Sequence, residues 1–269
     1  MPIADSLRIV KILDAERETP SIKTFFFEDL LCSRAKPGQF LMVWMPGVDE
    51  VPMSLSTIGG RSSVTVAKVG EATAAMHNLK VGDLVGVRGP YGNPFKPVGK
   101  RALVVGGGVG IAPLVPLTEL LLKDGVETTA ILGARTAEEI PLMNRLEALT
   151  KGLKMVKVTE DGSCGIRGLV TDAADRLMRR DRVDVVYTCG KELMMWKIYR
   201  MAIERGIRVQ ASLDRYMRCG MGLCGSCCVG GYRVCKEGPV FSETQLKEIE
   251  GEFGRAYKDR SGRKVEFSS

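Results

Sequence analysis

The chain has 269 residues, of which 45% are hydrophobic and 26% charged, a composition typical of a folded globular protein rather than a disordered one. At roughly 150 residues per domain, this length predicts about two domains. His77 is the single histidine, which excludes zinc hydrolases with two histidine ligands and iron oxygenases with a two-histidine, one-carboxylate site. The basic residues behind the net charge of +7 are scattered among acids, so they predict a solvated surface and no nucleic-acid binding.

Residues 1–97 carry the signals of a small antiparallel β-barrel or sandwich. Runs of β-branched and aromatic residues at 22–27 and 40–45, and an alternating stretch at 63–69, predict strands. Pairs of glycine or proline separate these runs, as in folds built from several short strands joined by tight turns.

From about residue 98, short apolar runs alternate with helix-like stretches, which predicts βαβ units on a parallel sheet. The predicted strands are 102–105, 128–132, 154–158 and 183–187, and the predicted helices are 114–123, 138–149, 169–179 and 192–204. The next segment is dense in glycine and cysteine and ends in a short helix-like stretch. We therefore divide the chain into domains at 1–97, 98–210 and 211–250, with a C-terminal tail at 251–269.

A glycine-rich turn follows the first strand of the α/β segment. Its glycines are Gly106, Gly107, Gly108 and Gly110. Residues without side chains let the backbone approach a pyrophosphate, and a helix start offers unpaired N–H donors, so the turn favours nucleotide binding. Pro113 stands where a third glycine is expected, and ligand-free turns of this kind are also common. Arg135, after the next strand, suits a 2′-phosphate or plain solvation equally well.

Five of the eight cysteines fall within residues 219–235. Four of them, Cys219, Cys224, Cys227 and Cys235, give the spacing C-x4-C-x2-C-x7-C, whose first part is the plant-type [2Fe–2S] pattern. The glycines between them let the loop bend so that its amides face the sulfurs. The alternative is a structural zinc site, which usually consists of paired C-x2-C knuckles with a wider separation. We leave Cys228 out because adjacent side chains do not readily point to one centre.

These features resemble the ferredoxin–NADP reductase superfamily and, within it, the electron-transfer subunits of type B dihydroorotate dehydrogenase. The resemblance covers residues 6–246 and rests on the cysteine spacing, the glycine turn and several short segments, namely 37–40, 52–55, 70–73, 89–95 and 235–241. It implies a multi-domain protein with an antiparallel β-barrel FAD domain, an α/β parallel-sheet nucleotide-binding domain and a small C-terminal [2Fe–2S] domain.

The same resemblance implies which residues hold the cofactors. Along the flavin, its ribose and its pyrophosphate it places Val51, Pro52, Met53, Ser54, Val66, Ala67, Lys68, Ala72 and Thr73. It also places Cys189 beside the nicotinamide. An equally good interpretation is that Cys189 is a small buried residue with a structural role only. Family members usually carry an arginine for the FAD phosphate at the position of Val51, so either Lys68 or Arg61 replaces that charge or FAD binds more weakly.

The implied partner is an FMN-containing dihydroorotate dehydrogenase catalytic subunit, in a heterotetramer of two plus two. Electrons from dihydroorotate would pass through the [2Fe–2S] cluster and FAD to NAD+ in pyrimidine biosynthesis, with the choice between NAD and NADP left open. Two alternatives remain: a subunit of a ferredoxin:NAD(P) oxidoreductase or hydrogenase complex, and a zinc-containing binding module. The sequence shows neither a signal-peptide pattern nor a long apolar run, so we expect a soluble, cytoplasmic protein without membrane contact.

Overall fold

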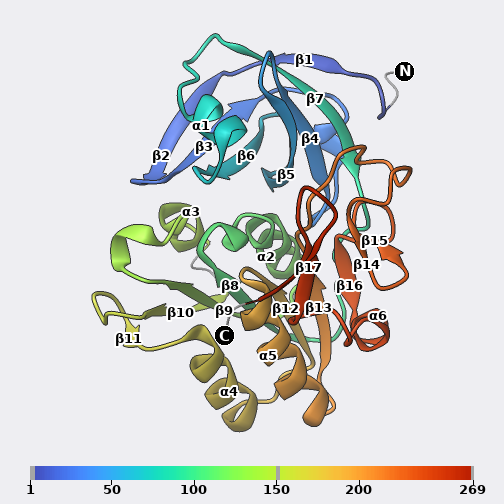
Figure 1. The fold of residues 1–269 in the computed structure, drawn as a ribbon. Helices are drawn as coiled ribbons and strands as arrows, with labels where there is room; N and C mark the ends of the chain where they lie inside the picture. Colours follow the sequence, from blue (N-terminus) through green and yellow to red (C-terminus); the bar gives the residue numbers. More distant parts are fainter. Residues whose placement is uncertain (1–3, 150–151, 268–269) are drawn as a thin grey trace.

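A computed structural model describes residues 4–149 and 152–267. The first part of the chain forms a seven-stranded antiparallel sheet with the strand order β1-β7-β4-β5-β6-β3-β2, curled into a half-barrel (Figure 1). Its strands are β1 (Arg8–Lys11), β2 (Asp14–Thr19), β3 (Ile22–Phe27), β4 (Phe40–Met45), β5 (Asp49–Thr57), β6 (Ser62–Ala67) and β7 (Leu84–Tyr91). The short helices η1 (Cys32–Arg34) and α1 (Glu71–His77) lie between strands. The predicted antiparallel β domain is confirmed.

The interior of the half-barrel is filled by alternate side chains of its strands. In β4, for example, Leu41 and Val43 are almost completely buried, and in β6 Val64 and Val66 are. Met76 of α1 packs into the same cluster. Because burial of one such side chain stabilises a fold by about 1.5–3 kcal/mol, this alternation fixes the register of the sheet.

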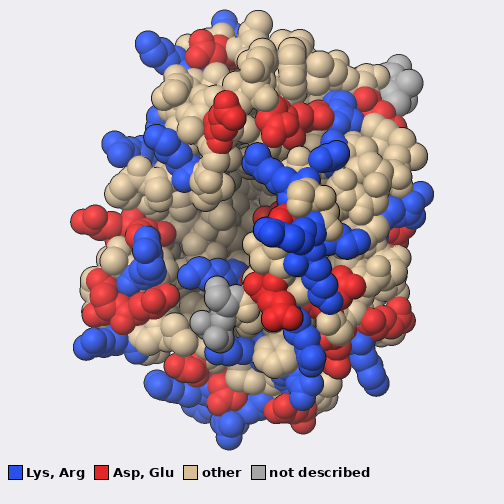
Figure 2. Space-filling view, viewed as in Figure 1, with Lys and Arg blue, Asp and Glu red and all other residues tan. Residues whose placement is uncertain are grey.

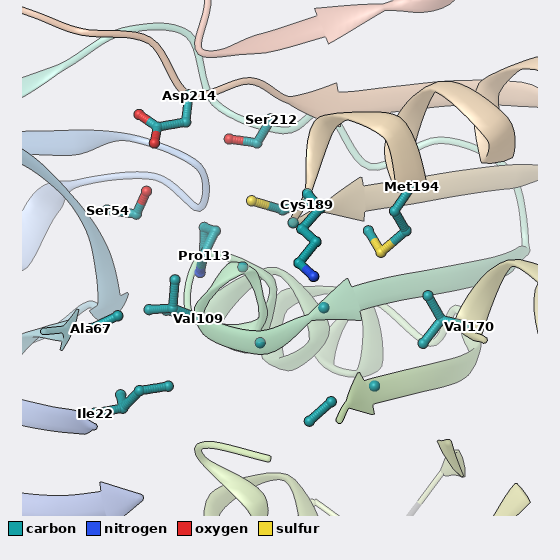
Figure 3. Close-up of a pocket in the computed structure, with 18 of the residues that line it drawn as sticks. Ile22, Ser54, Ala67, Val109, Pro113, Val170, Cys189, Met194, Ser212 and Asp214 are labelled. Carbon is teal, nitrogen blue, oxygen red and sulfur yellow. The ribbon is translucent and has the colours of Figure 1, made fainter. Parts of the chain in front are cut away.

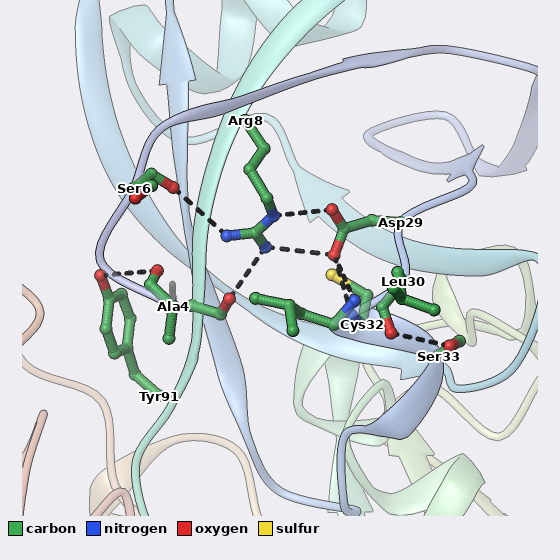
Figure 4. A network of polar contacts seen from close by, with 10 residues as sticks. Ala4, Ser6, Arg8, Asp29, Leu30, Cys32, Ser33 and Tyr91 are labelled. Carbon is green, nitrogen blue, oxygen red and sulfur yellow. Dashed lines mark hydrogen bonds and ion pairs between the residues drawn. The ribbon is translucent and has the colours of Figure 1, made fainter. Parts of the chain in front are cut away.

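The edge strand β1 is held in place by an ion pair, drawn in Figure 4. Arg8 Nε donates to the Asp29 carboxylate at 2.7 Å, and Arg8 Nη2 donates to the Gly89 carbonyl at 2.8 Å. Asp29 in turn accepts the backbone N–H of Cys32 at 2.9 Å. Hydrogen bonds between charged groups are about twice as strong as neutral ones, so this network ties β1, β7 and η1 together.

The second sheet has the order β11-β10-β9-β8-β12-β13-β16 and is parallel except for its last strand. Its strands are β8 (Arg101–Gly107), β9 (Glu127–Ala134), β10 (Leu153–Thr159), β11 (Ile166–Arg167), β12 (Val185–Cys189), β13 (Arg208–Ser212) and β16 (Val240–Ser242). Helix α2 (Leu114–Lys123) packs on one face, and α4 (Val170–Arg180) and α5 (Glu192–Glu204) pack on the other. The predicted βαβ architecture is confirmed. None of the helices formed by the described residues has the length and apolar character needed to span a bilayer.

One predicted helix, 138–149, is wrong in its extent. The structure has a 3-10 turn, η3 (Ala137–Glu139), and a separate short helix, α3 (Met143–Glu147). Pro141 lies between them, and a proline disfavours the helical conformation of the residue before it. Leu142 then adopts a left-handed φ of 59°, which restarts the helix in a new direction.

The cysteine region is inserted between two neighbouring strands of the second sheet. The chain leaves β13, forms the loop and the small hairpin β14 (Cys228–Val229) and β15 (Tyr232–Arg233), and returns as β16 antiparallel to β13. Helix α6 (Glu243–Glu248) follows. The sequence-based boundary at 210 falls inside β13. The cysteine loop therefore continues directly from the nucleotide-type sheet.

Residues of the expected C-terminal tail form the hairpin β17 (Ala256–Lys258) and β18 (Lys264–Glu266). In Figure 1 this hairpin, in dark red, extends from the second sheet towards the half-barrel. A buried ion pair anchors its start. Glu192 Oε1 accepts Arg215 Nη2 at 2.8 Å and the Gly254 N–H at 2.9 Å, and the two charged side chains are 6% and 3% exposed. The pair joins α5, the cysteine region and the C-terminal segment.

Replacing Glu192 by glutamine is expected to lower the free energy of unfolding by about 3–5 kcal/mol, because Arg215 would keep a buried, uncompensated charge. Chemical denaturation followed by circular dichroism measures this loss. The matched control on the same helix is Glu204→Gln, which removes an exposed ion pair with Arg200 and should change stability by about 1 kcal/mol or less. Equal effects of the two substitutions would contradict the anchoring role.

Candidate functional site

A cavity of about 780 Å³ lies between the half-barrel and the carboxyl ends of the parallel strands. Figure 2 shows it as a hollow in the molecular surface, with Lys and Arg side chains gathered beside it. Its volume is in the upper part of the range typical of ligand sites, and ligands of open α/β sheets bind at this edge. The position and size of the cavity suit an extended ligand that touches both sheets.

The cavity collects many of the residues singled out from the sequence. Those that line it are Pro52, Met53, Ser54, Ala67, Thr73, Gly107, Gly108, Gly110 and Cys189. Those outside its lining are Val51, Val66, Lys68, Ala72 and Gly106. Of these, Val51 and Val66 pack against the core of the half-barrel. His77 lies outside as well, with its Nε2 2.9 Å from the backbone oxygen of Val66.

The hydroxyl group of Thr73, at the start of α1, forms its hydrogen bonds with the backbone of the loop before the helix. Thr73 Oγ1 accepts the backbone N–H groups of Val69 and Gly70, both at 2.9 Å, and donates to the Gly70 carbonyl at 2.9 Å. A hydroxyl has one donor and two acceptor positions, so all three are used. The hydroxyl contact with a pyrophosphate, expected from the sequence, has no free donor in this arrangement.

The glycine turn is pressed against the end of β12. A Cβ atom on Gly110 would lie 2.6 Å from the carbonyl carbon and oxygen of Cys189 and from Cα of Gly190. Gly108 has a φ of +53°, and a Cβ atom there would meet nothing within 4 Å. Gly110 thus allows two backbone segments to touch, whereas Gly108 leaves open space beside the cavity.

Replacing Gly110 by alanine should destabilise the fold by about 1–3 kcal/mol and weaken dinucleotide binding, because the added methyl group meets backbone that cannot rotate away. Denaturation and fluorescence titration with NADH measure the two effects. Gly60→Ala is the control, since a Cβ atom there meets nothing within 4 Å. Unchanged stability of the Gly110 variant would contradict this expectation, because it would show that the end of β12 can move to make room for the methyl group.

The wall opposite the half-barrel carries residues that follow β12 and β13. Figure 3 shows Cys189, Ser212 and Asp214 on this wall, with Ser54 of β5 across the cavity. Desolvation, reinforced by the charge of Asp214, raises the pKa of the Cys189 thiol to about 12, so Cys189 is a neutral thiol at physiological pH. Desolvation also raises the pKa of Asp214. Sequence reasoning missed Ser212 and Asp214, although their place at a strand's carboxyl end was a usable signal.

At the far end of the cavity, Arg135 follows β9 and is held by an acidic partner. Its Nη2 and Nε donate to the two carboxylate oxygens of Glu139 at 2.6 and 3.0 Å. Glu160 lines the same part of the cavity. Acidic groups at this edge accept hydrogen bonds from a ribose 2′-hydroxyl and repel a 2′-phosphate. Arg135 neutralises Glu139 and lines the cavity together with Glu160, so this end of the cavity carries charges of both signs.

The cysteine loop directs backbone amides at sulfur atoms. Gly222 N–H points to Cys235 Sγ at 3.1 Å, Leu223 N–H to Cys219 Sγ at 3.3 Å, and Cys235 N–H to Cys227 Sγ at 3.4 Å. Gly220, Gly222 and Gly225 have φ values of +72°, +85° and +73°, which the turns of this loop require. Amide donors stabilise thiolates, so the loop fits a thiolate-bound cluster.

The same contacts alter the acidity of two thiols. Desolvation opposes ionisation of Cys219, but hydrogen bonds from the amides of Cys224 and Leu223 outweigh it and lower its pKa to about 6. A hydrogen bond with Cys235 lowers the pKa of Cys227 to about 6. The pKa of Cys228 is raised, chiefly by desolvation, and that of Cys235 is raised, chiefly by its hydrogen bond with Cys227, so acidity does not separate Cys228 from the predicted ligands.

The arrangement of the thiols also bears on the zinc alternative. Within residues 4–149 and 152–267, no group of three or more His, Cys, Asp or Glu residues is gathered so that it could hold a metal ion. A structural zinc ion needs its four ligands around one point, whereas the four thiolates of a dinuclear cluster are shared between two irons. The C-x4-C-x2-C spacing, which is the plant-type [2Fe–2S] pattern, favours the dinuclear cluster.

Substitution of Cys224 by serine should remove the part of the visible absorbance that belongs to the cluster, together with the bound iron of the purified chain, because one iron would lose a thiolate ligand. Cys224 is exposed, so the change leaves the core untouched. Cys228→Ser is the matched control and should keep both signals. Iron analysis and absorption spectra after anaerobic purification measure the effect, and loss of iron from the Cys228 variant alone would reverse the assignment.

Comparison with known proteins identifies the family. Residues 214–247 match the model of the iron–sulfur cluster binding domain of dihydroorotate dehydrogenase B, and residues 104–200 match the oxidoreductase NAD-binding domain. A protein of Methanocaldococcus jannaschii, named "Probable dihydroorotate dehydrogenase B (NAD(+)), electron transfer subunit", is 44% identical over 261 residues, covering 96% of this chain and 98% of its own. The chain belongs to this family.

Solved structures share the fold of this chain. A chain from the structure of an NADH-dependent reduced ferredoxin-NADP oxidoreductase has a TM-score of 0.80 and 29% identity, covering 91% of this chain and 94% of its own. The flavohemoglobin of Malassezia yamatoensis, solved with FAD and heme, has a TM-score of 0.65 at 19% identity, covering 75% and 57%. The second likeness is one of fold alone, and it extends over the half-barrel and the parallel sheet together.

Proposed function

We propose that this chain is the electron transfer subunit of a dihydroorotate dehydrogenase B. It carries electrons from a partner catalytic subunit, where dihydroorotate is oxidised at FMN, through a [2Fe–2S] cluster and FAD to NAD+. The printed name of the relatives supports the identity of the complex. The arrangement of this chain's own residues supports the order in which the electrons pass.

The observation that carries the proposal is the contact between the cysteine loop and the cavity. Met217 and Pro239, on either side of the four cysteines, line the cavity that also contains Ser54 and Cys189. The loop rests on the half-barrel as well, because Arg88 Nη1 donates to the Cys219 carbonyl at 3.3 Å. A cluster in this loop would adjoin a flavin in the cavity, as single-electron transfer between the two requires.

The residues that would hold the cofactors follow from the same cavity. FAD would lie along Pro52, Met53, Ser54 and Ala67, and NAD+ would enter over the glycine turn towards Cys189. FAD, when bound, supplies the chemistry that joins one-electron transfer to hydride transfer. The chain's own part is to orient both ligands and exclude water, with the neutral Cys189 thiol on the wall beside the nicotinamide position. The name of the relatives, which specifies NAD(+), favours NAD+ over NADP+.

The proposal extends to domains and assembly. We assign FAD binding to residues 1–97, NAD binding to 98–210 and cluster binding to 211–250. The assembly is a heterotetramer of two of these chains with two catalytic subunits. We place it in the cytoplasm, where thiols that bind a cluster stay reduced.

The test is reconstitution with a dihydroorotate dehydrogenase catalytic subunit of the same family. The purified complex should form orotate and NADH from dihydroorotate and NAD+, with a lower rate for NADP+, and its mass should correspond to two plus two. The complex with Cys224→Ser should lose NAD+ reduction but keep orotate formation with an artificial acceptor at the partner. A chain that reduces ferredoxin with NADH but never couples to dihydroorotate would support the alternative oxidoreductase, which the structural likeness to the ferredoxin-NADP oxidoreductase favours.

A further inference from the structure

The proposed FAD site lacks an obvious cation for the diphosphate of FAD. Val51 is apolar and packs against the half-barrel core. Arg61 is paired with Asp14 at 2.7 Å, and its guanidinium lies over the ring of Phe26. Lys68, like Arg61, lies outside the lining of the cavity, and none of the half-barrel residues within that lining is positively charged.

Nearby groups of the same domain are occupied as well. The hydroxyl of Thr73 is saturated by contacts with Val69 and Gly70. The ammonium group of Lys23 donates to the carbonyl of His77 at 2.7 Å. A positive charge for this corner of the cavity has to come from another part of the chain.

The C-terminal hairpin brings such a charge. Arg260 stands in the turn between β17 and β18, and its Nη2 lies 3.9 Å from the position of a Cβ atom on Gly70. Arg260 is not itself in the lining of the cavity, but Gly70 adjoins Val69, and Val69 and Thr73 both line it. Among the described residues, no carboxylate forms an ion pair with Arg260 and its guanidinium makes no hydrogen bond, so its donors are available to a ligand.

Two contacts hold Arg260 in this position. Its guanidinium carbon lies 5.7 Å from the centroid of the Tyr216 ring, and that of Arg218 lies at the same distance from this ring. Arg218 Nη2 also donates to the backbone carbonyl of Arg260 at 3.3 Å. A cation near an aromatic ring is attracted by the ring's quadrupole, so the segment before Cys219 supports the hairpin turn.

We propose that Arg260 provides the guanidinium that pairs with the FAD diphosphate, in place of the arginine that other members of the superfamily carry at position 51. The C-terminal hairpin then serves as a strap that reaches from the second sheet across to the half-barrel and completes the flavin site. The inference rests on the proposed function, since it requires FAD in the cavity. Guanidinium–phosphate pairs are strong and directional, which makes one arginine sufficient for a measurable effect.

The test compares Arg260→Gln with Lys264→Gln, a substitution in the same hairpin with the same change of charge at an exposed side chain. Purified chain freed of flavin is titrated with FAD, and binding is followed by flavin fluorescence. We expect about tenfold weaker FAD binding for Arg260→Gln and unchanged binding for Lys264→Gln. The wild-type affinity should also fall as salt rises, and that of Arg260→Gln should fall less steeply, because salt screens a charge pair.

The outcomes separate this inference from the proposed function. If the unaltered chain binds no FAD, the proposed function fails. If it binds FAD and Arg260→Gln binds equally well, or shows the same salt dependence as the unaltered chain, the role of Arg260 is overturned. Cluster absorbance and the thermal midpoint of the variant show whether it is folded; weak FAD binding with both unchanged supports the proposal, whereas weak binding together with loss of the cluster overturns it.

Discussion

The pairing of β16 with β13 is the constraint on which the rest of the site depends. It returns the chain to the parallel sheet immediately after the last cysteine, with Ala211 opposite Phe241. Both ends of the cysteine loop are therefore fixed to the sheet that forms one wall of the cavity. Rates of electron transfer fall steeply with distance, so a loop held at both ends maintains a separation that a flexible linker could not.

Two further devices keep the parts in register across the molecule. At Gly110 the backbone of the glycine turn lies directly against the backbone at the end of β12, which fixes the position of the turn relative to that strand. The buried pair of Glu192 and Arg215 binds the start of α5 to the segment that leads into the cysteine loop. Its link to Gly254 also fixes the base of the C-terminal hairpin. A shift of any one of these segments would move a wall of the flavin site.

The features that sequence reasoning predicted are those encoded in neighbouring residues. The cysteine spacing and the strand and helix periods are local, and helix 192–204 appears with the predicted bounds. The helix predicted over 138–149 from its periodicity is wrong, because Pro141 disfavours a helical conformation of the residue before it and divides the segment in two. The position of Asp214 could have been predicted from its place after the carboxyl end of a strand, whereas the relation of Arg260 to the cavity depends on segments distant in sequence. The engaged hydroxyl of Thr73 likewise becomes visible only once the α1 loop has folded.

The strand β16 has a second consequence, for the behaviour of the chain in the cell. Without it, β13 would end the sheet with a row of unpaired backbone donors and acceptors, and such edges recruit strands from other molecules. The strand that covers this edge belongs to the segment that holds the iron. By covering this edge, β16 protects the parallel sheet against such recruitment, and a chain cut before Val240 would leave β13 exposed to it.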